Sequence, residues 1–75
     1  MEIIDLRETP KGCKEHPLIR LKRIINEMGH GSKIKVITNT KIVPLEIVEI
    51  LAERKGAKYV STKINDNVYE IIIEY

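Results

Sequence analysis

Residues 17–28 read PLIRLKRIINEM, and this stretch decides the fold class. Its apolar side chains recur at steps of three and four residues, the spacing of one buried face of a helix. They are Leu18, Leu21, Ile25 and Met28, with Ile24 widening the stripe. Pro17 suits the first helical position, because its missing N–H costs nothing there. We therefore predict an amphipathic helix over residues 16–28.

The remaining segments predict one more helix and four strands. Residues 44–55 follow the helical pattern, with acids early, bases late and Gly56 after them, as the helix dipole and C-cap favour. The face of this helix that we expect to be buried consists of Ile47, Val48, Leu51 and Ala52. The strands are expected over residues 3–6, 33–38, 59–64 and 68–75.

Two details of the strands are also predicted. Residues 3–6 contain Ile3, Ile4 and Leu6, an apolar run typical of a buried strand. Residues 65–67, NDN, join the last two strands. We expect a hairpin turn there because Asn and Asp tolerate left-handed dihedrals.

The order of elements, βαβαββ, predicts an α/β fold. Since each helix has one apolar face, both are expected on one face of a four-stranded mixed sheet, as a two-layer α/β sandwich. Five side chains should be buried between the layers: Leu18, Leu21, Ile25, Val48 and Leu51. We expect residues 1–75 to form a single domain, whose small size places chemistry on the surface or at a partner interface.

Composition restricts the classes of function. The net charge is +2 and the three Tyr are dispersed, so nucleic-acid binding is not favoured. No apolar run approaches the ~18 residues of a membrane span, and residues 1–8, MEIIDLRE, are not a signal peptide. The Ile-rich apolar content, together with abundant Lys and Glu, is typical of a thermophilic source.

The chain has one cysteine, Cys13, which excludes an intramolecular disulfide and a Cys-rich zinc site. A lone thiol suits the reducing cytoplasm. With two His residues besides, the set is poor for a metal, so we expect no metal and no cofactor.

Cys13 precedes the first predicted helix and is flanked by Lys11 and Lys14. The positive end of the helix dipole and the two lysines favour the thiolate, the form that attacks and carries sulfur. Gly12 leaves room for a partner's reactive sulfur, while Glu15 opposes ionisation. The alternative is an ordinary loop residue or a small apolar plug.

Other polar residues near Cys13 have two interpretations. His16 could act as a base for the thiol, although a solvated residue near the helix cap is the simpler interpretation. Arg7, Arg20, Lys22 and Arg23 could bind phosphate or an acidic partner, or form the solvated face of a helix.

The chain resembles the TusA-like (SirA-like) sulfur carriers over nearly all its residues. In that family a first strand bearing Asp-x-Arg-Gly leads to C-P-x-P, which opens a helix rich in basic residues. Here residues 5–7, DLR, precede the cysteine loop, and Pro17 opens the basic helix. Residues 31–36, GSKIKV, are similar to the family's second strand, Gly-x-x-Leu-x-Val.

The cysteine motif departs from that pattern. Cys13 precedes Pro17 by four positions where the family has three, and Lys14 replaces the first Pro. Glu8 stands where the Gly after Arg is expected, in a longer loop. The chain is either a divergent carrier or a relative that kept the scaffold and lost the chemistry.

The resemblance implies a small sulfur carrier or sulfurtransferase. Cys13 would accept persulfide sulfur from a cysteine desulfurase-like donor and pass it to an acceptor protein, with Lys11, Gly12, Lys14 and Pro17 in support. Arg20 and Arg23 would form the docking surface for these partners. Two alternatives remain: a non-catalytic partner- or RNA-binding regulatory module on the same scaffold, and an interaction module in which Cys13 has no role.

Overall fold

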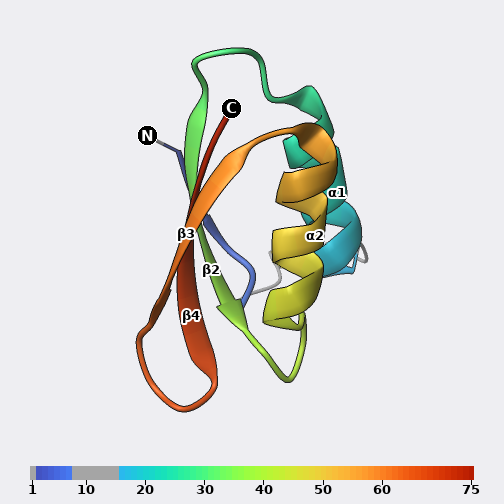
Figure 1. Ribbon diagram of the computed structural model, residues 1–75. Coiled ribbons are helices and arrows are strands. Elements are labelled where there is room, and N and C mark those ends of the chain that lie inside the picture. Colours follow the sequence, from blue (N-terminus) through green and yellow to red (C-terminus); the bar gives the residue numbers. More distant parts are fainter. Residues whose placement is uncertain (1, 8–15) are drawn as a thin grey trace.

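The computed structural model describes residues 2–7 and 16–75. The elements, in chain order, are β1 (Glu2–Asp5), α1 (Pro17–Glu27), β2 (Lys33–Asn39), α2 (Leu45–Lys55), β3 (Lys58–Lys63) and β4 (Val68–Glu74). Both helices lie on the same side of the sheet (Figure 1). The predicted two-layer α/β sandwich of order βαβαββ is confirmed.

The four strands form one mixed sheet in the order β1-β2-β4-β3. β1 and β2 are parallel, while β2 and β3 both pair with β4 in antiparallel fashion. β1 and β2 therefore end at the same edge of the molecule, and both helices begin there (Figure 1). In α/β folds the carboxyl ends of parallel strands are the usual place for a functional site.

The helices begin and end where the sequence predicts. Pro17 is at the start of α1, and the ring of His16 accepts the backbone N–H of Leu18 at 3.1 Å. Pro44 directly precedes α2, and Gly56 ends that helix in the left-handed conformation, with φ at 82°. Any other residue would be strained at that φ, which explains the glycine.

The core lies between the helix layer and the sheet. α1 contributes the buried side chains of Leu21 and Ile25, and α2 contributes Val48 and Ala52. Leu18 and Leu51 are half-buried and pack against this core. Of the five side chains expected between the layers, Leu21, Ile25 and Val48 are buried. Leu18 and Leu51 lie at the margin of the core.

The first strand differs from the prediction of a buried run. Ile4 and Leu6 are each 1% exposed, but Ile3 is 61% exposed. Successive side chains of a strand point to opposite faces of the sheet, and only one face is covered by helices. β1, which lies at the edge of the sheet, therefore has one buried face, and Leu6 follows it in a turn.

The hairpin turn at residues 65–67 forms as predicted but for a different reason. Among the described residues no amino acid other than glycine has a positive φ. The side-chain Oδ1 of Asn65 instead accepts the backbone N–H groups of Asn67 at 3.2 Å and Val68 at 3.1 Å. The side chain of Asn65, together with the backbone hydrogen bond from the Ile64 N–H to Val68 O at 2.8 Å, holds this turn without a left-handed residue.

Candidate functional site

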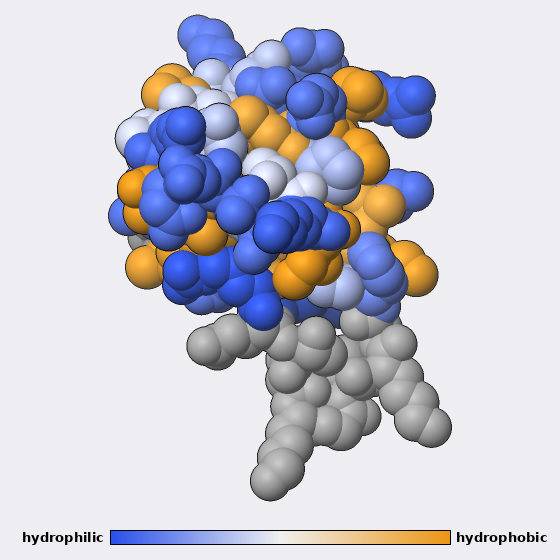
Figure 2. All heavy atoms as spheres, turned by 90° about the horizontal axis from the view of Figure 1, so that it is seen from below, coloured by the Kyte–Doolittle hydropathy of each residue, from blue (hydrophilic) through white to orange (hydrophobic). Residues whose placement is uncertain are grey.

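The candidate site lies at the end of the molecule where β1 stops and α1 starts. Cys13, Lys11, Gly12 and Lys14 lie outside the described residues, so this end is built from the residues on either side of them. Figure 2 views the molecule from this end, where hydrophilic side chains gather and hydrophobic ones show between them.

Asp5 and Arg7 form a closed turn at the end of β1. The guanidinium of Arg7 donates from Nε to Asp5 Oδ1 at 3.0 Å and from Nη2 to Oδ2 at 2.8 Å. The backbone N–H of Arg7 also donates to Oδ1, at 2.9 Å. The Asp-x-Arg pattern, which the sequence shares with the TusA-like carriers, thus builds a two-point ion pair that ends the strand.

Arg20 adds positive charge to the same place. The hydrogen bond from the Arg7 side chain lowers the pKa of Asp5, against a smaller rise from partial burial, and the charge of Arg20 lowers it further. Arg20 is half-buried on the first turns of α1, so its charge acts on Asp5 from across the site. Asp5 contributes one negative charge, and Arg7 and Arg20 contribute two positive charges. These three side chains together are therefore positively charged.

Arg7→Gln should raise the pKa of Asp5 toward its ordinary value, because the strongest group holding it down is removed. A lowered pKa stabilises the native chain above about pH 4, and this stabilisation is lost as the pH falls through the lowered pKa. Arg7→Gln should lack this fall in stability at low pH. Carboxyl-carbon NMR titration of Asp5 checks the shift, and an unchanged titration would contradict the ion pair.

The start of α1 is electrostatically open to an anion. No acidic residue occupies the first turn of α1, whereas the first turn of α2 contains Glu46. The dipole of a helix start favours a negative charge. The N–H groups of Leu18 and Ile19 are already bonded to His16, and Pro17 has none, so the dipole supplies this effect. An anion next to α1 would therefore be stabilised, and no side chain of that first turn competes with it.

His16 lies at this helix start but is engaged as a cap. Its Nδ1 accepts the Leu18 N–H, so the neutral ring carries its proton on Nε2. The lone pair that a base would use on Nδ1 is already occupied. The structure supports the interpretation of His16 as an exposed cap residue and does not support the base.

His16→Ala should lower the free energy of unfolding by about 0.5–1 kcal/mol, the usual effect of removing an N-cap side chain. His16→Asp should restore or raise stability, since Asp is a stronger cap that also complements the dipole. Urea unfolding of the three proteins measures both changes. Equal midpoints for the native chain and the Ala variant would show that the cap contributes nothing.

The basic residues of α1 do not form one group. Arg20 is close enough to Asp5 to affect its pKa, while Lys22 lies on the side of α1 that faces α2. Arg23 is exposed between them on the outer surface. The structure thus places Arg20 near Asp5 at the candidate site, while Lys22 belongs to a separate groove that sequence spacing alone does not reveal.

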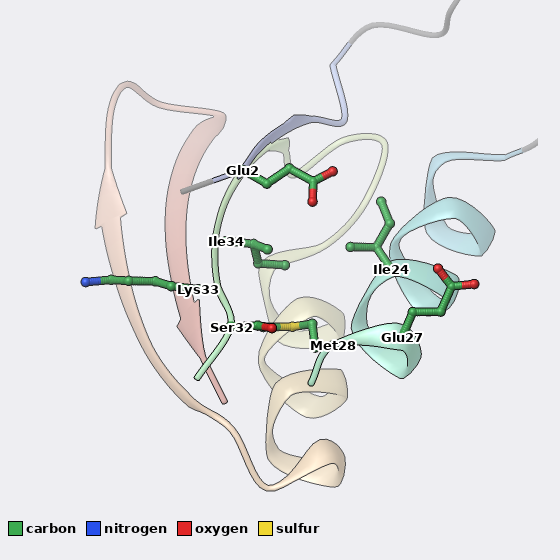
Figure 3. Close-up of a pocket in the computed structure, with 7 residues that line it drawn as sticks. All are labelled: Glu2, Ile24, Glu27, Met28, Ser32, Lys33 and Ile34. Carbon is green, nitrogen blue, oxygen red and sulfur yellow. The ribbon is translucent and has the colours of Figure 1, made fainter. Parts of the chain in front are cut away.

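A second hollow, of about 430 Å³, lies at the opposite end of the molecule, where β1 begins and α1 ends. Met28 and Ile34 lie between helix and strand, with the carboxylates of Glu2 and Glu27 on its two sides (Figure 3). Its distance from the start of α1 separates it from any chemistry at Cys13.

The described part of the chain contains neither a cluster of metal-binding side chains nor a helix that could cross a membrane. Residues 2–7 and 16–75 contain no group of three or more His, Cys, Asp or Glu side chains that could hold a metal ion. Neither described helix has the length and apolar character that crossing a membrane requires.

Comparison with known proteins identifies the class. Residues 16–75 match the family described as "Sulfurtransferase TusA". The match covers both helices and the last three strands, so the chain belongs to the TusA sulfurtransferase family. No curated protein and no solved structure matches the chain.

Family membership supports a sulfur-carrier or sulfurtransferase-like role, with sulfur exchanged between this chain and partner proteins in general. The matched region begins at His16, three positions after Cys13. The scaffold is therefore what the comparison establishes.

Proposed function

We propose that this protein carries persulfide sulfur on Cys13 between a cysteine desulfurase-like donor and an acceptor protein. The observation that carries the proposal is its membership of the TusA family over residues 16–75, combined with the position of its one cysteine just before that region. Three peptide units span at most about 11 Å, so a thiol at position 13 works close to the start of α1.

The proposed step is an exchange between thiol and persulfide. The Cys13 thiolate attacks the outer sulfur of a donor persulfide, and a new bond forms between that sulfur and Cys13 Sγ. The sulfur–sulfur bond of the donor breaks, and the donor cysteine leaves as a thiolate with the bonding electrons. Cys13 then holds the persulfide. No external oxidant, reductant or cofactor takes part, and the same step toward an acceptor thiolate discharges the carrier.

Three features of the described residues support this chemistry. The start of α1 has no acid in its first turn, so it stabilises a thiolate or persulfide anion. Pro17 begins α1 there, and Arg20 brings positive charge to the same end. Arg20 and Arg23 would contact partner proteins beside the thiol, and Lys11, Gly12 and Lys14 would flank it in the sequence.

The test is to load the chain and then unload it. We would incubate the protein with a cysteine desulfurase and cysteine, remove the donor, and measure the intact mass for one added sulfur. Cyanide should then release that sulfur as thiocyanate and return the original mass. If the chain gains no sulfur from this donor or from inorganic polysulfide, the proposed carrier function is wrong and only the TusA fold remains.

A further inference from the structure

A groove of about 390 Å³ runs between the two helices on the outer side of the helix layer. α1 lines it with Lys22, Ile25 and Asn26, and α2 lines it with Leu51, Arg54 and Lys55. Three of these side chains are cationic and none is acidic. The groove is therefore positively charged on its walls.

The charges of α2 are divided between its two sides. On the side toward β3, Glu49 accepts a hydrogen bond from the Ser61 hydroxyl at 3.2 Å, and Glu53 accepts one from Tyr59 at 2.8 Å. The bond to Glu53 raises the pKa of Tyr59. Glu49 and Glu53 therefore point toward β3 and not into the groove. The bases of the last turn of α2, Arg54 and Lys55, line the groove.

The groove cations differ in what they already contact. Lys55 is fixed, since its Nζ donates to the backbone O of Asn26 at 3.1 Å and lies 4.6 Å from the centre of the Tyr75 ring. Lys22 and Arg54 form no ion pair with any of the described residues. Two unneutralised cations therefore face each other across the groove from different helices.

Part of the floor of the groove is apolar. Leu51 is half-buried and offers apolar surface between the basic walls, whereas Ile25, at 2% exposed, contributes almost none. An occupant that fits has carboxylates for Lys22 and Arg54 and an apolar side chain for the floor. An acidic segment of a protein has both.

We propose that this groove docks an acidic segment of a protein that exchanges sulfur with this chain, which rests on the function proposed above. The α1 residues of the groove extend from Lys22 to Asn26, six to ten residues along the helix from His16, or about 9–15 Å at the rise of a helix. A segment held in the groove therefore leaves the start of α1 uncovered for the sulfur-bearing residue of the same partner.

Nucleic acid and free phosphate fit this groove less well. Three cations neutralise few phosphates, and a phosphate gains nothing from an apolar floor. The nearby Tyr75 ring is stacked on His30 with centroids 4.5 Å apart and also contacts Lys55, so it is not an open platform for a base.

The probe is a synthetic capped peptide of alternating Glu and Leu, titrated at physiological salt and followed by backbone amide NMR. It should shift the amides of Lys22, Asn26, Leu51 and Arg54, and its Gln/Leu counterpart should not. Lys22→Glu/Arg54→Glu should weaken binding about tenfold, because two exposed attractions become repulsions. Lys41→Glu/Lys63→Glu, with the same charge change elsewhere, should weaken it less than about twofold. If the reversal unfolds the chain, Lys22→Gln/Arg54→Gln replaces it.

The outcomes separate the groove from the thiol. The docking proposal would be overturned if the peptide shifted amides outside the groove. It would also be overturned if both double variants weakened peptide binding equally. Tighter binding of single-stranded RNA or inorganic phosphate at the same amides would overturn it as well. Loading of Cys13 by inorganic polysulfide should be unchanged in the groove variant. If the peptide binds the groove but Cys13 takes no sulfur from any donor, the proposed function and the groove's part in it both fall.

Discussion

Cys13→Ser is expected to abolish sulfur loading, with a loss of at least about 100-fold that reaches the detection limit. The chain has no other cysteine, and a serine hydroxyl is not ionised near neutral pH as a thiol partly is. The measurement is thiocyanate released by cyanide after incubation with a cysteine desulfurase and cysteine.

The matched control for Cys13→Ser is His16→Ala, which should keep loading because Nδ1 of His16 is engaged in the helix cap. Thermal unfolding of the serine variant should match that of the native chain, so that lost loading reports lost chemistry. Sulfur retained by the serine variant would contradict the carrier role of Cys13. Loss of loading in His16→Ala with the fold intact would instead make that histidine a functional group.

Ile71→Ala should lower the free energy of unfolding by about 3–4 kcal/mol, through lost burial and the cavity left behind. Ile71 is 0% exposed on β4, a strand paired on both sides. Domains of this size are stable by only about 4–11 kcal/mol, so this one change removes a large share.

Ile3→Ala is the control for the core substitution, since it deletes the same atoms from a side chain that is 61% exposed. It should cost less than about 1 kcal/mol. Urea unfolding of both variants gives the comparison. Equal losses would mean that the helices do not cover the face of the sheet that holds Ile71.

Most of the fold could be predicted because its signals are local. The spacing of Leu21 and Ile25 defines one face of a helix, and Pro17 and Gly56 mark where helices begin and end. The prediction that Ile3 is buried was wrong, for a reason that no local sequence pattern contains. Whether a strand is covered on one face or two depends on where the helices pack, and here one face of β1 stays open.

The candidate site could be predicted only in part. The Asp5–Arg7 ion pair has a sequence signal, the Asp-x-Arg of the family pattern, and the structure shows its geometry. The groove of Lys22 and Arg54 has none, because these residues are 32 positions apart and meet only through the packing of α1 on α2. Arg20 and Lys22 are near neighbours in sequence, yet Arg20 lies near Asp5 and Lys22 lines the groove between the helices.

The most direct test of the central claim is to find where the sulfur resides. The chain would be loaded with a cysteine desulfurase and cysteine, alkylated to trap persulfides, digested, and the peptide containing Cys13 sequenced by tandem mass spectrometry. The account predicts one extra sulfur on Cys13, absent when cysteine is omitted and removed by cyanide. A Cys13 peptide that carries only the alkylated thiol, under conditions in which the donor itself holds persulfide, would contradict it.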